Sequence, residues 1–175
     1  MADHYGSAEI IAGLYGQAYG HDTAECFTKW VPVPGPVSPE DVRAAVQRAL
    51  DRMRADRLDL LQYHAWNYAD PSYLDTLLHL QELKAEGMIR YLGLTNVDTV
   101  HLGMILKSGI EVVSNQVCFS LLDQRARTNG MLDLCKEQGV TVLAFGTIAG
   151  GFLTDRWYGQ PEPDWDRLET WSQMK

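Results

Sequence analysis

Three side chains that together could protonate a carbonyl oxygen stand in separate segments of this 175-residue chain. Tyr5 follows Ala-Asp-His near the first residue, Lys29 lies in Phe-Thr-Lys-Trp, and His64 follows Asp-Leu-Leu-Gln-Tyr. An ammonium beside a phenol favours the phenolate, so it makes the phenol a better acid near neutral pH. A neutral imidazole nearby can hydrogen-bond a substrate carbonyl and orient it. The group therefore suits acid catalysis of carbonyl reduction.

Each of these residues also has a purely structural interpretation, which the residues taken singly leave open. Tyr5 could be an unanchored aromatic near a chain end, Lys29 could extend to solvent from a sheet edge, and His64 could be a core histidine. Two of them stand at the ends of expected strands, and parallel sheets carry functional residues there. We therefore expect all three to converge on one face of a sheet.

Strand-like and helix-like segments alternate along the chain. Apolar runs predict strands over 26–31, 58–63, 89–94, 111–117 and 140–145. Periodicity and capping residues predict helices over 8–14 behind Ser7, from Ser38 onward, over 73–83 closed by Gly87, from Asp98 to about Lys107, and over 126–138 closed by Gly139. The continuous apolar character of 140–145 predicts a strand that is buried on both faces.

This alternation without hairpin signals predicts an α/β fold with a parallel sheet. A doubly wound nucleotide fold would need G-x-G-x-x-G after an early strand, whereas Gly13, Gly16 and Gly20 follow a helix. A (β/α)8 barrel of the TIM type fits the repeat better, although a whole barrel needs eight strands and about 250 residues. We therefore expect a single domain over 1–175 that is a partial barrel of about five strands.

Composition and charge exclude several other classes of protein. The formal net charge of −8 argues against a nucleic-acid surface, and no apolar run is long enough to span a bilayer. Three cysteines without a C-x-x-C pair, and first residues without a secretory signal, predict a cytoplasmic protein. The histidine spacing predicts no metal site, and there is no G-x-S-x-G hydrolase motif.

Polar residues also end the later strands. Thr95 and Asn96 end the third, Gln116 lies in the fourth, and Phe145 and Gly146 end the fifth. Amides beside an aromatic ring could hold a planar heterocycle that carries a carboxamide, and glycines let backbone N–H groups approach a phosphate. Asn and Gly are also common in ordinary turns, but that interpretation is weaker for Gln116, which lies within its strand.

These segments, in this order, resemble those of the aldo-keto reductase family. The similar segments are Ala-Asp-His-Tyr-Gly-Ser-Ala-Glu at Tyr5, Thr-Lys-Trp at Lys29, Asp-Leu-Leu-Gln-Tyr-His ending at His64, the run from Glu82 to Asn96, Asn-Gln-Val at 115–117 and Ala-Phe-Gly at 144–146. The resemblance extends over 1–153. The remaining 154–175 is a Trp-rich acidic tail, in which we expect an irregular loop and a short helix from about Asp164.

The resemblance implies a (β/α)8 barrel with NADP(H)-dependent reduction of a small carbonyl compound or oxidation of an alcohol. It makes Tyr5 the proton donor, Lys29 the residue that makes the phenol more acidic, and His64 the residue that orients the carbonyl. It implies a cofactor-binding set of Thr95, Asn96, Gln116, Phe145, Gly146, Thr147 and Leu153. In that set the first three hold the carboxamide, and the phenyl ring stacks on the nicotinamide.

The resemblance covers strands three to seven of the family barrel. A catalytic aspartate would stand five residues before Tyr5, outside this sequence, as would the first two strands and the last. Open sheet edges attract other strands, so we expect a homo-oligomer that covers them. Two alternatives stand beside an impaired reductase. One is a cofactor-independent acid–base enzyme such as an isomerase, dehydratase or cyclase, and the other is a non-catalytic dimer.

Overall fold

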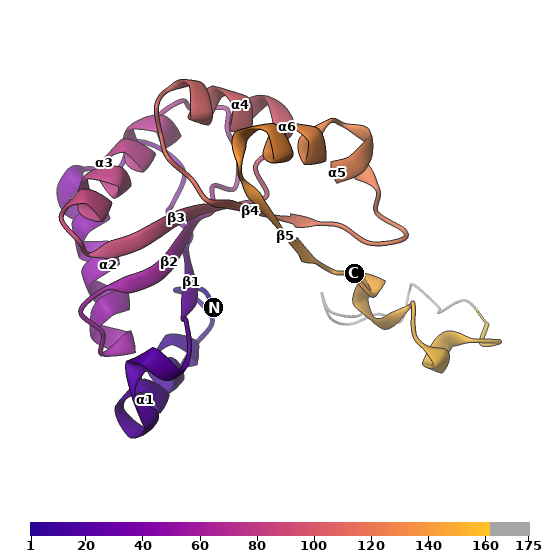
Figure 1. Ribbon diagram of the computed structural model, residues 1–175, viewed down its shortest axis with the longest axis horizontal. Coiled ribbons are helices and arrows are strands. Elements are labelled where there is room, and N and C mark those ends of the chain that lie inside the picture. Colours follow the sequence, from indigo (N-terminus) through magenta and orange to yellow (C-terminus); the bar gives the residue numbers. More distant parts are fainter. Residues whose placement is uncertain (162–175) are drawn as a thin grey trace.

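Five parallel strands form one curved sheet in the computed structural model, in which residues 1–161 are described (Figure 1). The strands follow each other across the sheet in chain order. They are β1 (Phe27–Trp30), β2 (Leu58–Tyr63), β3 (Ile89–Thr95), β4 (Ser114–Cys118) and β5 (Thr141–Phe145). Parallel neighbours joined by helices are the partial barrel that the sequence predicts, so the expected α/β fold class is confirmed.

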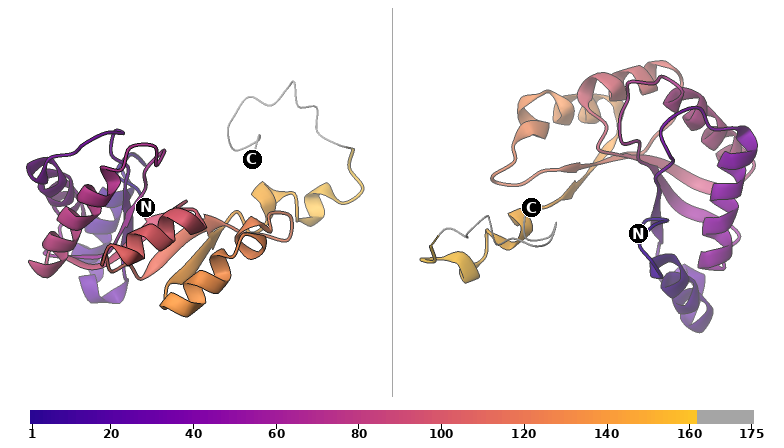
Figure 2. Two further views of the ribbon diagram at one scale, coloured as in Figure 1. Left: turned by 90° about the horizontal axis from the view of Figure 1, so that it is seen from above. Right: turned by 180° about the vertical axis from the view of Figure 1, so that it is seen from behind.

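Helices cover one face of this sheet, here called the outer face, while the opposite inner face is open (Figures 1 and 2). The helices are α1 (Ala8–Tyr19), α2 (Pro39–Met53), α3 (Tyr73–Ala85), α4 (Thr99–Lys107), α5 (Arg125–Thr128) and α6 (Met131–Gln138). Three short 3-10 helices are also present in the described residues, η1 (His21–Thr23), η2 (Ala149–Gly151) and η3 (Asp155–Trp157). The turns after β5 project beyond the sheet, away from α2 and α3.

The core lies between the outer face and the helices. The apolar face predicted for α2 is buried as a set, namely Val42, Ala45, Val46, Ala49, Leu50 and Met53. From α3, Leu77 and Leu80 are completely buried. Burial of aliphatic side chains on this scale is the main favourable term in folding, so this layer fixes the sheet on which the inner-face side chains stand.

Two of the predicted helix caps form and one does not. The Ser38 hydroxyl accepts a hydrogen bond from the Asp41 N–H, and an Asp98 carboxylate oxygen accepts one from the His101 N–H. Ser7 makes no side-chain cap, contrary to prediction, and α1 continues well beyond the expected end at residue 14.

The helix predicted over 126–138 is split into α5 and α6. Gly130, at the break, has a φ of 80°, a left-handed conformation that favours glycine and interrupts a helix. The fourth strand begins at Ser114, three residues later than the predicted 111. The helix expected from about Asp164 lies outside the described residues.

The prediction that the fifth strand is buried on both faces is wrong. Thr141 and Ala144 are exposed, and the other residues of β5 are only half-buried. The physical reason is its place in the sheet, because within residues 1–161 β5 pairs only with β4 and its other edge is open. The apolar composition of β5 therefore led to a wrong prediction of burial, because β5 is the last strand of the sheet.

Candidate active site

The register of the sheet aligns polar side chains in rows on the inner face. Lys29 pairs with Gln62, Gln62 with Gly93, and Gly93 with Ser114. In the next row toward the carboxyl ends, Thr95 pairs with Gln116. Paired residues of parallel strands point to the same face, so these side chains share the inner face of the sheet.

Hydrogen bonds join these rows into one network. The Lys29 ammonium donates to Gln116 Oε1 at 3.1 Å, from β1 across the curved sheet to β4. The buried Gln62 amide donates to the same oxygen at 3.3 Å and lies 3.4 Å from the Thr95 hydroxyl. A Cβ on Gly93 would lie 2.5 Å from the Ser114 hydroxyl, so glycine leaves room for this close packing.

Tyr5 lies in a hydrogen-bonded turn that is attached to the sheet edge. The Asp3 N–H donates to the Lys29 carbonyl at 2.9 Å, and the Tyr5 N–H donates to the Ala2 carbonyl at 3.0 Å. The Lys29 ammonium lies 5.8 Å from the centre of the Tyr5 ring, while the tyrosine itself is 55% exposed. The first two residues of the predicted group are therefore in contact range, with the phenol open to a ligand.

His64 follows β2 directly, at its carboxyl end. Its Nε2 lies 3.5 Å from the Asn96 amide nitrogen, and its ring lies 5.3 Å from that of Trp66. Burial is the largest cause that lowers the pKa of His64, and repulsion from Lys29 and His4 lowers it further. The imidazole is consequently neutral at neutral pH and can exchange a hydrogen bond with a carbonyl group.

The Lys29 ammonium is half-buried, and burial lowers its pKa because the charged form loses hydration. Within residues 1–161 no carboxylate lies within ion-pair distance of it. Its bond to the neutral Gln116 therefore leaves the ammonium able to interact with a phenolate.

The predicted cofactor residues fall into two groups. Thr95, Asn96 and Gln116 lie with the Lys29 network, and Asn96 adopts a φ of 57° while its N–H donates to the Gln116 carbonyl. The second group lies at the end of β5 and in the segment that follows it. It consists of Phe145, which pairs with Cys118, together with Gly146, Thr147 and Leu153, and these last three are exposed.

Gln62 was not predicted as a site residue, although the sequence carried a signal for it. It is a buried amide in β2, a strand whose other residues apart from Asp59 are leucines and a tyrosine, and a polar residue in such a strand is what singled out Lys29 in β1. A neighbour of the site was missed for another reason. The buried Glu9 carboxylate accepts hydrogen bonds from Thr28 and Arg52, a contact that links α1, β1 and α2 and has no local sequence signature.

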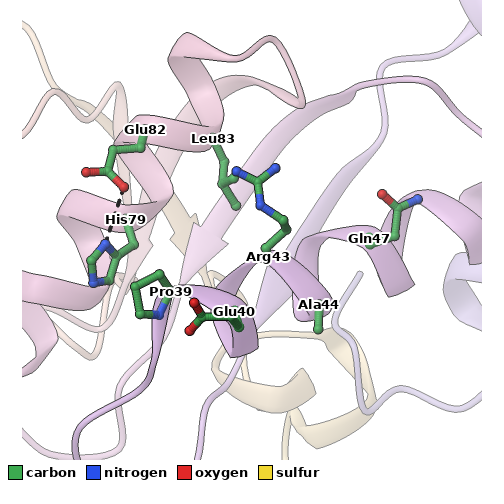
Figure 3. Close-up of a pocket in the computed structure, with 8 residues that line it drawn as sticks. All are labelled: Pro39, Glu40, Arg43, Ala44, Gln47, His79, Glu82 and Leu83. Atoms are coloured by element: carbon green, nitrogen blue, oxygen red, sulfur yellow. Dashed lines mark hydrogen bonds and ion pairs between the residues drawn. The ribbon is translucent and has the colours of Figure 1, made fainter.

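A groove of about 540 Å³ lies away from this network, between α2 and α3 (Figure 3). Its lining includes Arg43 and Gln47 from α2 and the facing His79–Glu82 pair of α3, whose hydrogen-bonding atoms lie 3.4 Å apart.

In the described part of the chain, no cluster of His, Cys, Asp or Glu could hold a metal ion. No helix found within residues 1–161 is long and apolar enough to cross a membrane.

The sequence profile of the Aldo/keto reductase family matches residues 1–174, so the chain belongs to that family. It is 36% identical over 121 residues to the NADH-specific methylglyoxal reductase of Escherichia coli (strain K12), a match that covers 67% of this chain and 36% of that protein. It is 35% identical over 117 residues to the glyoxal reductase of Bacillus subtilis (strain 168), covering 66% of this chain and 41% of that protein.

Solved structures of aldo-keto reductases share the fold. The holo form of AKR11C1 from Bacillus halodurans superimposes with a TM-score of 0.76 at 28% identity, covering 93% of this chain and 55% of that chain. The thermostable Tm1743, in complex with the inhibitor epalrestat, gives a TM-score of 0.78 at 25% identity and covers 89% and 57%. The chain thus spans about half of these solved chains and less of the curated relatives.

Proposed function

We propose that this chain carries the carbonyl-reducing site of a nicotinamide-dependent aldo-keto reductase, with Tyr5 as proton donor. The observation that carries the proposal is the Lys29 ammonium, 5.8 Å from the centre of the Tyr5 ring. In support, the pKa of His64 is lowered first by burial and then by repulsion from Lys29 and His4, which favours the neutral imidazole. A bound reduced nicotinamide would supply hydride to the carbonyl carbon.

In this proposal each side chain has a distinct role. The Tyr5 hydroxyl gives its proton to the carbonyl oxygen as negative charge develops there, and the Lys29 ammonium stabilises the phenolate that remains. The neutral His64 imidazole donates a hydrogen bond to the same oxygen and so orients the carbonyl. Lys29 and His64 are half-buried, which strengthens their interactions relative to water.

The residues present fit a nicotinamide carboxamide in their chemistry. A carboxamide needs both donors and acceptors, and the Thr95 hydroxyl and the amides of Asn96 and Gln116 offer both kinds at one end of the inner face. In addition, Phe145 ends the neighbouring strand and would provide an apolar surface for the ring. We propose that NADP(H) is the dinucleotide, with NAD(H) as the alternative to be compared.

The substrate class proposed is a small aldehyde or ketone, or the corresponding alcohol in reverse. This follows from the family and from the openness of the inner face, where Tyr5 is 55% exposed. The sequence has three widely spaced cysteines and no C-x-x-C pair, which suits a reducing compartment, so the cytoplasm is the proposed location.

The test combines binding and turnover on the purified chain. Quenching or enhancement of NADPH and NADH fluorescence measures binding, and loss of dinucleotide absorbance with methylglyoxal measures reduction. We expect Tyr5→Phe to retain dinucleotide binding but to lose reduction by roughly 10²-fold or more. Tyr19→Phe, at an exposed tyrosine of α1, is the matched control and should reduce methylglyoxal at the rate of the unaltered chain.

Absence of both binding and oxidation would contradict the proposal. Turnover of a carbonyl or hydroxy compound without any dinucleotide, lost in His64→Ala, would instead favour the acid–base enzyme. Binding without turnover in the unaltered chain would indicate a non-catalytic protein.

We also propose that a second copy of the chain covers the exposed surface beside β1. Within α1 the large side chains Ile10, Ile11, Leu14, Tyr15 and Tyr19 are all more than 40% exposed. Such a contiguous apolar helix face is typical of an interface. Light scattering is expected to give a dimer mass, and Ile11→Glu with Leu14→Glu should shift it to a monomer, while a monodisperse unaltered monomer would contradict the proposal.

A further inference from the structure

His4 is a basic side chain beside the candidate site that the proposed chemistry does not use. Its Nδ1 lies 2.9 Å from Asp3 Oδ1, so the carboxylate holds one side of the ring. Its ring meets the Tyr5 ring edge to face, with centroids 4.8 Å apart and planes at 77°. That geometry is a favourable one for two aromatic rings.

The backbone of this segment is fixed from two sides. The Asp3 N–H donates to the Lys29 carbonyl of β1 at 2.9 Å, and the Arg52 guanidinium of α2 donates to the Asp3 carbonyl at 2.9 Å. Arg52 also donates to the buried Glu9 carboxylate at 3.1 Å. The His4–Tyr5 ring pair therefore projects from an anchored segment rather than from a free chain end.

The same imidazole also acts electrostatically on His64. The charged groups that act on His64 are Lys29 from β1 and His4 from the N-terminal segment, and both lower its pKa by repulsion in addition to burial. Its other neighbours, the Asn96 amide and the Trp66 ring, are uncharged. The Asp3 carboxylate is hydrogen-bonded to His4.

We propose that His4, held by Asp3, is a positioning residue of the reductase site: its ring fixes the Tyr5 phenol beside the carbonyl, and its imidazole keeps a basic group next to His64. His4 itself transfers no proton to the substrate in this arrangement. The catalytic role of His4 rests on the proposed function. The contacts of His4 with Asp3 and Tyr5 are present whether or not the chain is active.

The first experiment therefore needs no dinucleotide and no substrate. NMR of the full chain with labelled histidine and tyrosine should show a nuclear Overhauser effect between the His4 and Tyr5 rings. In His4→Phe the pKa of His64 should rise toward its ordinary value, because one repelling group is gone. His79→Phe, in the groove between α2 and α3, should leave that pKa unchanged. Absence of the ring contact, or an unshifted His64 in His4→Phe, overturns the proposal.

The second experiment separates the ring contact from the charge. His4→Ala should lower kcat for methylglyoxal reduction roughly tenfold with little change in the KM for dinucleotide, because Tyr5 is less well held. His4→Phe keeps an aromatic edge and should recover most of kcat, while the acid limb of its pH–rate profile moves to higher pH. Equal kcat values in the two variants overturn the positioning role. If the unaltered chain reduces nothing, the proposed function fails, whereas the NMR result still decides whether His4 holds Tyr5 and acts on His64.

Discussion

The two faces of the sheet differ in what they bury. The outer face presents Leu61, Leu92 and Leu94, each at most 1% exposed, to the apolar sides of the helices. The inner face presents an ammonium, two carboxamides and a hydroxyl in one hydrogen-bonded network. Apolar burial and the proposed chemistry thus lie on opposite faces of the sheet, so substitutions on the two faces should differ in whether they change stability or activity.

The largest expected effect is on the inner face. Lys29→Met removes the ammonium that lies 5.8 Å from the centre of the Tyr5 ring and should lower methylglyoxal reduction by roughly 10²-fold. Its free energy of unfolding should stay equal or rise, because a half-buried ammonium without an ion pair is replaced by an apolar chain. Steady-state rates and urea titrations on the same preparation measure both quantities. A Lys29→Met variant that is less stable but has an unchanged kcat would contradict the separate roles of the two faces.

The outer face should show the reverse. Leu77 is completely buried between α3 and the sheet, so Leu77→Ala should cost about 2–5 kcal/mol of unfolding free energy through lost burial and a cavity. Urea denaturation followed by circular dichroism measures this loss. The kcat per folded molecule should remain that of the unaltered chain, and a fall in kcat larger than the fall in folded fraction would count against separate roles.

A smaller effect is expected at a helix end far from the inner face. The Ser38 hydroxyl accepts the Asp41 N–H at 3.1 Å, so Ser38→Ala should cost about 1 kcal/mol of unfolding free energy. Ser38→Asp retains a capping oxygen and serves as the control that should be nearly neutral. If Ser38→Ala and Ser38→Asp had the same stability, the cap would contribute nothing.

The smallest effect is the pH dependence of stability that His64 introduces. Its pKa is below the ordinary 6.5 when folded, so between that value and its folded pKa the unfolded chain binds more protons. The free energy of unfolding should therefore fall as the pH drops through this window. Urea midpoints at neutral and mildly acidic pH should differ less in His64→Gln than in the unaltered chain, and an equal or larger difference in the variant would contradict the sign.

The spacing of apolar residues predicted most of the fold, because the helices that cover the outer face bury side chains at regular helical intervals. The buried face of α2 and the caps at Ser38 and Asp98 are local features that depend on neighbouring residues. The exposure of β5 was missed because it depends on which strands lie beside it, and an apolar strand looks the same in the middle and at the edge of a sheet.

Strand ends indicated only part of the candidate site, since Lys29 lies late in β1 and His64 directly follows β2, whereas Tyr5 lies in a turn before α1. Tyr5, Lys29 and His64 were predicted from their side-chain chemistry and from similar family segments, and their roles stay predictions. Gln62 and His4 were not, because their roles depend on contacts across strands or on a carboxylate partner that pattern alone does not identify.

The central claim is that a reduced dinucleotide bound at this inner face would supply hydride to a carbonyl carbon, while Tyr5 gives a proton to the carbonyl oxygen. The most direct measurement is reduction of methylglyoxal with a dinucleotide deuterated at the transferring carbon, followed by mass spectrometry of the alcohol. We expect one deuterium in the product and a rate that falls roughly 10²-fold or more in Tyr5→Phe. Alcohol without deuterium, no alcohol at all, or an unchanged rate in Tyr5→Phe would contradict the claim.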